Sequence, residues 1–176
     1  MIKRFLISAI AILCCACMVF AFSACKKNED ENKDTSNATA SGIFYVKYEN
    51  AKIELGKEAN SALSALGEAK SVKELGDCAG IGAQVKYTYD NFDIYTVKSA
   101  DSEIIDEISF TSDIIKTPKG ICLGDDTAAV TDAYGTPTSQ SAKSIIYTQG
   151  KSSLIFGLEN GYVKSIDYKY QIKSAD

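Results

Sequence analysis

The sequence contains no histidine and no tryptophan, and Arg4 is its only arginine. Histidine is the commonest general base and the commonest metal ligand of proteins, so its absence removes both roles. Because Arg4 is the only arginine, a clamp for phosphate or carboxylate groups built from several arginines is also excluded. The sequence also has no P-loop, dinucleotide-binding fingerprint or Gly-x-Ser-x-Gly motif. We therefore expect a protein that is not an enzyme and that uses no cofactor and no metal ion.

Basic residues are outnumbered along most of the chain. The 176 residues include 19 Lys and Arg against 23 Asp and Glu. Without Lys3 and Arg4, the remaining 17 basic and 23 acidic residues give a net charge of −6. This balance argues against nucleic acid, and against an anionic membrane surface, as the primary ligand.

The first 25 residues have the pattern of a secretory leader. Lys3 and Arg4 precede an apolar run of 18 residues from Phe5 to Phe22, which is typical of a signal peptide. The following "FSAC", Phe22 to Cys25, resembles a bacterial lipobox, with phenylalanine where leucine is usual. That resemblance implies that residues 1–24 are removed and that Cys25 carries a diacylglyceryl group. Two or more acyl chains anchor a protein stably, so we predict attachment to the extracytoplasmic face of a bacterial cell membrane.

An uncleaved membrane helix is the alternative interpretation of this leader, because 18 apolar residues are just enough to span a bilayer. Both interpretations place the rest of the chain outside the cytoplasm. The segment after Cys25, "KKNEDENKDTSNATAS", has almost no apolar residues. Such a segment cannot bury enough apolar surface to offset the entropy lost on ordering. We therefore predict a disordered tether over 25–42 and a folded domain over 43–176.

The predicted domain contains two similar segments. "KIELGKEANSALSALGEAK", from Lys52, aligns with "GICLGDDTAAVTDAYGTPT", from Gly120, and two glycines keep their spacing. In each segment, apolar residues at helical spacing are followed by runs with strand character. We expect helices over 57–66 and 126–134, each preceded by a short strand that ends at a glycine, Gly56 or Gly124. Further strands are expected over 85–89, 92–97, 104–110, 144–148, 153–158 and 162–170. The predicted fold class is α+β, with two tandem copies (43–116 and 117–176) of a helix-then-antiparallel-meander unit and the helices packed on one face of the sheet.

The second segment, continued by "IIYTQGKSSLIFGLENGYVKSIDY", resembles the repeat of the beta-lactamase inhibitor protein fold, which small lipoproteins of outer-membrane assembly share. More narrowly, "GDCAGIGAQVKYTYDNFDIYTV" resembles Firmicute surface lipoproteins of unassigned function. The resemblance covers about residues 50 to 170. It implies a fold and a surface location, and it does not imply inhibition of a beta-lactamase.

Two cysteines remain in the predicted domain, Cys78 and Cys122. Disulfides form readily outside the cytoplasm, and a bridge between these two residues would join the two predicted copies. Two separate thiols are the preferred interpretation, because buried cysteine acts as a small hydrophobic residue. Neither thiol is a candidate nucleophile, since no histidine is present to activate it.

Aromatic residues are concentrated in the predicted strands. Two short helices cannot cover both faces of a sheet, so we expect part of this set on an open face that binds a partner; the candidates are Tyr87, Tyr89, Phe92, Tyr95 and Tyr147. Ordinary core filling is the competing explanation. The predicted function is binding of a protein or envelope component through this face and the Gly76–Gly82 loop. The alternatives are a sensory lipoprotein that binds a small molecule or cell-wall fragment, and a hydrolase that uses only carboxylates.

Overall fold

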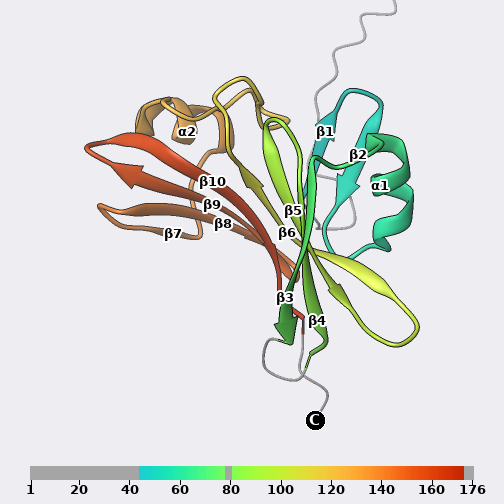
Figure 1. Ribbon diagram of the computed structural model, residues 1–176. Helices are drawn as coiled ribbons and strands as arrows, with labels where there is room; N and C mark the ends of the chain where they lie inside the picture. Colours follow the sequence, from blue (N-terminus) through green and yellow to red (C-terminus); the bar gives the residue numbers. More distant parts are fainter. Residues whose placement is uncertain (1–43, 78–80, 173–176) are drawn as a thin grey trace, which may run out of the picture. The chain divides into compact units, whose positions relative to one another are not determined.

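The computed structural model describes residues 44–77 and 81–172 of the chain (Figure 1). The predicted signal peptide, Cys25 and the tether lie outside these residues, as do Cys78 and part of the Gly76–Gly82 loop. The elements within them are β1 (Tyr45–Tyr48), β2 (Ala51–Glu54), α1 (Ala59–Leu66), β3 (Ser71–Asp77), β4 (Ala83–Thr88), β5 (Phe92–Lys98), β6 (Glu103–Phe110), α2 (Thr127–Tyr134), β7 (Ser139–Gln140), β8 (Ser144–Gln149), β9 (Ser152–Glu159) and β10 (Tyr162–Tyr170).

The main sheet is antiparallel and has the strand order β3-β4-β5-β6-β10-β9-β8-β7. β1 and β2 form a separate two-stranded hairpin. At the centre of the main sheet, β6 pairs with β10, which aligns Ile108 with Tyr168. This pairing joins the strands that follow α1 to the strands that follow α2 in one continuous sheet (Figure 1).

The predicted fold class is wrong. Strands make up 50% of the structure and helices 13%, so the protein is mostly β and is not an α+β pair of helix-then-meander units. The prediction missed β1, β3 and β7. β3 is exposed at all seven positions, so it lacks the alternation of apolar and polar residues by which strands are recognised. The aligned segments also differ in structure, because Ala51–Glu54 forms β2 whereas residues 120–124 form no strand.

Both helices lie where the apolar spacing predicts them, and local sequence explains their ends. The Asp126 side chain accepts a hydrogen bond from the Ala129 N–H at 2.7 Å and so caps the N-terminus of α2. Each helix ends at a glycine in the left-handed region, Gly67 with φ 76° and Gly135 with φ 77°. Side chains with a Cβ rarely adopt this conformation, which is why a glycine stops each helix.

The hydrophobic core lies on one face of the main sheet. Ile94, Ile108 and Tyr168 are aligned across β5, β6 and β10, and all three are buried. Ala59 and Ala62 of α1 and Val130 of α2 belong to the same core, so both helices pack against this face. We refer to it as the helix-side face, and to the opposite face of the same strands as the open face. No helix within 44–77 and 81–172 is long and apolar enough to cross a membrane.

Candidate functional site

The structure does not place the five predicted binding residues on one open face. Phe92 is completely buried and Tyr147 is 7% exposed, and both belong to the core. Tyr87 and Tyr89 are half-buried and pack against that core. Tyr95 is the one member of the set that points to the open face, because it pairs with Glu107 in a row opposite to the core row. Core filling therefore explains most of this tyrosine and phenylalanine set.

Tyr87 has a structural role at the end of the helix-side face. Its hydroxyl donates to Glu103 Oε1 at 2.8 Å, and the buried Thr96 hydroxyl donates to the same oxygen at 2.6 Å. Burial and this hydrogen bond raise the pKa of Tyr87 to about 12. Tyr87 therefore remains protonated and serves as a donor that links β4 to Glu103, the first residue of β6, across β5.

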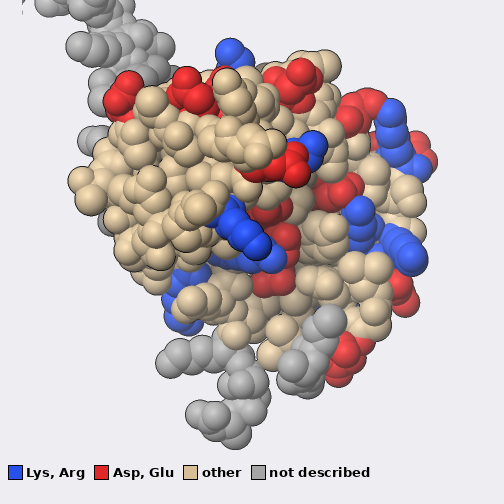
Figure 2. All heavy atoms as spheres, turned by 90° about the vertical axis from the view of Figure 1, so that its left-hand side faces the viewer, with Lys and Arg blue, Asp and Glu red and all other residues tan. Residues whose placement is uncertain are grey.

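The open face carries charges of both signs in mutual contact. Lys86 Nζ lies 2.8 Å from Asp93 Oδ2, and Lys169 Nζ lies 3.0 Å from Glu107 Oε2. The side of the molecule that carries α2 and β7–β10 also has charges of both signs. Acidic and basic side chains are interleaved over one half of this side, and a broad area of the other half has no charges (Figure 2). Neither surface has a strong field of one sign, which a partner selected by net charge would require.

The Cys122 thiol forms no disulfide with any described residue. Burial raises its pKa, and the nearby Asp125 carboxylate raises it further. A thiol of raised pKa is a poor nucleophile and a poor metal ligand. Cys78 lies outside the described residues, so the preference for two separate thiols stays a prediction. The described part of the chain contains no cluster of three or more Cys, Asp or Glu side chains suited to a metal ion.

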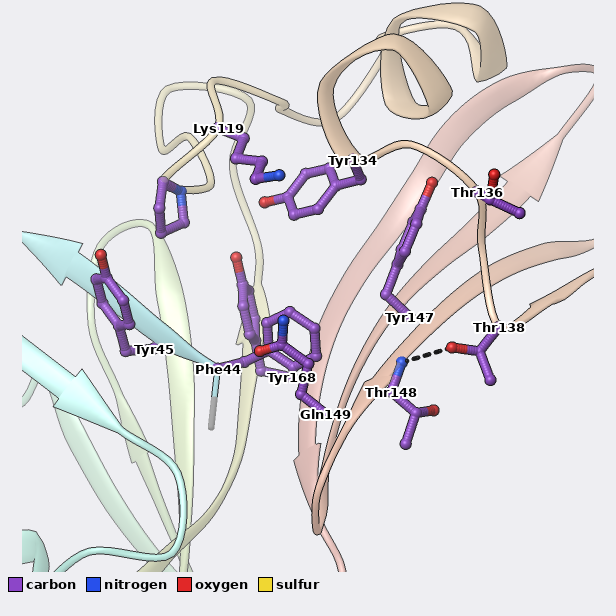
Figure 3. A pocket seen from close by; sticks show the side chains of 11 residues that line it. Phe44, Tyr45, Lys119, Tyr134, Thr136, Thr138, Tyr147, Thr148, Gln149 and Tyr168 are labelled. Carbon is purple, nitrogen blue, oxygen red and sulfur yellow. Dashed lines mark hydrogen bonds between the residues drawn. The ribbon is translucent and has the colours of Figure 1, made fainter. Parts of the chain in front are cut away.

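A pocket with a volume of about 260 Å³ lies beside the C-terminal end of α2 (Figure 3). It is partly open to solvent, and we call it the tyrosine pocket. Its lining comes from the start of β1, the loop before α2, the end of α2, the segment between α2 and β7, and strands β8 and β10: Phe44, Tyr45, Pro118, Lys119, Tyr134, Thr136, Thr138, Tyr147, Thr148, Gln149 and Tyr168.

Aromatic rings form the walls of the tyrosine pocket. The Tyr134 and Tyr147 rings are tilted against each other with centroids 5.2 Å apart, and Phe44 meets Tyr168 edge to face at 6.3 Å. Tyr147 is held in place because its hydroxyl donates to the Gly135 carbonyl at 2.9 Å. Lys119 Nζ lies 5.0 Å from the centre of the Tyr134 ring, which is within the range of a cation–π contact.

Two polar atoms of the pocket are buried without a hydrogen-bond partner among the described residues. They are the Tyr168 hydroxyl oxygen and Gln149 Oε1. Figure 3 shows the Tyr168 and Tyr134 hydroxyls directed toward each other beneath Lys119. Burial, and after it a weak interaction with the Tyr134 hydroxyl, raise the pKa of Tyr168, but the Tyr168 hydroxyl makes no well-formed hydrogen bond with a described residue. An unpaired buried polar group costs about 1–3 kcal/mol, so both atoms are suited to a ligand.

Burial fixes the protonation state of the tyrosines around the pocket. It raises the pKa of Tyr134 and Tyr147, and it raises that of Tyr168 well above its usual value. All three hydroxyls stay protonated near pH 7; those of Tyr134 and Tyr168 can donate and accept hydrogen bonds, whereas the Tyr147 hydroxyl gives its proton to the Gly135 carbonyl. They are poor general bases, which favours binding over acid–base chemistry at this site.

Sequence reasoning did not identify this pocket. Tyr147 belongs to the predicted set, but for a different face, and Tyr134 is the last residue of the helix predicted over 126–134. No local pattern marks Gln149 or Tyr168 as unpaired, because that property depends on groups far apart in the sequence. No family model, curated protein or solved structure matches this chain. The resemblance to surface lipoproteins therefore stays a prediction.

Proposed function

We propose that this protein is a lipid-anchored binding protein on the extracytoplasmic side of a bacterial membrane, and that it binds a small molecule or cell-wall fragment in the tyrosine pocket. The single observation that carries the choice of site is the pair of buried, unpartnered polar atoms on Tyr168 and Gln149 in an aromatic-lined cavity. Ligand sites are typically concave, mostly apolar and equipped with a few convergent polar groups.

The leader supports the location. The positive residues, the apolar run and the "FSAC" sequence ending at Cys25 have the order of a lipoprotein signal. The polar segment after Cys25 has the composition of a flexible linker. Such a linker would hold the ligand-binding domain away from the bilayer surface, where ligands of the cell envelope can reach it.

A tryptophan reporter tests ligand binding at the pocket. The natural chain has no tryptophan, so Lys119→Trp introduces a single fluorophore beside Tyr134 at the edge of the cavity. We expect a saturable change in its emission with at least one member of a library of neutral, anionic, cationic and apolar small molecules. Tyr162→Trp is the matched control, because Tyr162 is 58% exposed and lies outside the pocket. Equal responses from the two variants, or no response from either, would refute the proposed function.

The open face is the second candidate site, with a protein as its partner. Ile146 and Ile155 lie directly opposite each other on this face of β8 and β9, and both are only half-buried. Apolar side chains near paired charges are typical of a protein interface. Capture of one protein from an envelope extract should be lost in Ile155→Lys and retained in Lys119→Trp. Equal capture by both variants would exclude the open face as the binding surface.

A further inference from the structure

The unpaired polar atoms of the described residues are not spread evenly. Three buried side-chain atoms lack a hydrogen-bond partner there: Asp93 Oδ1, Gln149 Oε1 and the Tyr168 hydroxyl. Two of these three belong to residues that line the tyrosine pocket. Tyr168 is 1% exposed, so its hydroxyl is shielded from the outer surface. The positions of these atoms restrict the chemistry of the ligand that would pair with them.

Gln149 Oε1 and the Tyr168 hydroxyl need different hydrogen-bond partners. Gln149 Oε1 is an acceptor and needs a donor, whereas the Tyr168 hydroxyl can give its own proton to an acceptor. A hydroxyl group on the ligand can satisfy either atom, because it donates and accepts. It also suits the opposite orientation of the Gln149 amide, in which the NH₂ group replaces the oxygen. A purely apolar ligand would leave both atoms unpaired, at about 1–3 kcal/mol each.

The charges that line the pocket restrict the class of ligand further. None of the residues lining the pocket is acidic, so a cationic ligand would find no counter-ion, and it would be repelled by Lys119. An anionic group brings acceptors alone, so with the Gln149 amide oriented as in the structure it would leave Oε1 without a donor. A neutral ligand with several hydroxyl groups satisfies both atoms without either penalty.

Size and wall chemistry favour a single ring. The volume of about 260 Å³ is below the roughly 300–1,000 Å³ of sites that hold drug-sized ligands. Tyr134 and Tyr147 offer aromatic surfaces, against which a ring with C–H groups packs well. Because the pocket is partly open, the ring can be the end of a longer chain.

We propose that the tyrosine pocket binds a neutral saccharide unit, which gives a hydroxyl proton to Gln149 Oε1, accepts the Tyr168 hydroxyl proton and packs against Tyr134 and Tyr147. This inference rests on the proposed function, since it names the ligand class of the same pocket. Lys119 marks the open side of the site, where the rest of a glycan would continue.

Titration calorimetry on the full chain, in a detergent without a sugar headgroup, tests the ligand class. The probes are N-acetylglucosamine and glucose, with benzoate as the anionic ring and cyclohexanol as a ring with one hydroxyl. We expect at least one of the two sugars to bind more tightly than benzoate and cyclohexanol. If benzoate or cyclohexanol binds more tightly than both sugars, or if neither sugar binds, the saccharide inference is wrong. The proposed function still stands in those cases if the tryptophan reporter responds to another ligand.

Two conservative variants test the contacts. Tyr168→Phe keeps the ring and removes the hydroxyl, and Gln149→Leu keeps most of the side-chain volume. Loss of one neutral hydrogen bond, worth about 0.5–1.5 kcal/mol, corresponds to a roughly 2- to 12-fold weaker affinity for the sugar in each variant. The stability of free Tyr168→Phe should change little, because the removed hydroxyl makes no well-formed hydrogen bond with a described residue. Tyr162→Phe is the matched control and should bind the sugar like the natural chain. Unchanged affinity in both pocket variants would overturn the proposed contacts.

Discussion

Phe92 is the residue for which the binding-face and hydrophobic-core interpretations differ most clearly. The sequence places it among residues that contact a partner, whereas the structure buries it completely. Its ring lies 5.0 Å from that of Tyr48 and 5.2 Å from that of Tyr89. Phe92→Ala would therefore remove a fully buried ring and two aromatic contacts, and it should act on stability and not directly on binding.

The expected loss follows from the burial of the ring. Truncation of a buried phenylalanine to alanine lowers the free energy of unfolding by about 3–5 kcal/mol, because transfer energy is lost and a cavity remains. Each aromatic pair contributes about 0.5–1.5 kcal/mol beyond its buried area, which favours the upper part of that range. A domain is typically stable by about 5–15 kcal/mol, so Phe92→Ala should be folded but markedly weakened.

Urea titration followed by circular dichroism measures this loss. Tyr95→Ala is the matched control on the same strand, because Tyr95 points to the open face and its ring contacts Lys86 Nζ at 5.5 Å. Its expected loss is about 1 kcal/mol, the size of an exposed cation–π contact. If Phe92→Ala is too unstable to purify, Phe92→Leu should show a smaller loss in the same direction. A loss below about 1 kcal/mol for Phe92→Ala would refute its placement in the core.

Three further predictions concern a titration, a helix cap and the anchor. Tyr87 should ionise near pH 12 in a spectrophotometric titration, and Glu103→Gln should lower that pKa. Because the folded pKa is raised, the stabilising effect of Tyr87 is complete below about pH 10 and is lost as the pH rises toward 12; ionisation near pH 10 would contradict the burial and hydrogen bond. Asp126→Ala should lower the free energy of unfolding by about 1 kcal/mol in thermal melts, through loss of the α2 cap, and an unchanged melting temperature would argue against the cap. Cells that express the natural chain should incorporate labelled palmitate into it, and Cys25→Ser should abolish the label; label retained in Cys25→Ser would exclude this residue as the anchor.

Local features of this protein could be predicted from the sequence. The end of α1 at Gly67, the Asp126 cap of α2 and the turn at Asn160 and Gly161 between β9 and β10 all lie where neighbouring residues indicate them. Each depends on conformational preferences and hydrogen bonds within a few residues, so no distant contact is needed. Alternation along β5 also separates Phe92 from Tyr95, since side chains three positions apart point to opposite faces.

Pairing between strands that are distant in the sequence determined the arrangement of the sheet and the position of the pocket. The pairing of β6 with β10 makes one eight-stranded sheet. β3 forms an edge of this sheet, although its sequence lacks the alternation of apolar and polar residues that would predict a strand. The tyrosine pocket exists because the start of β1, the end of α2, β8 and β10 converge on one place. The sequence determined where helices and turns begin and end because those depend on neighbours. Which face each side chain occupies, and whether Gln149 and Tyr168 find partners, depends on strand register and long-range packing, which only the tertiary structure defines.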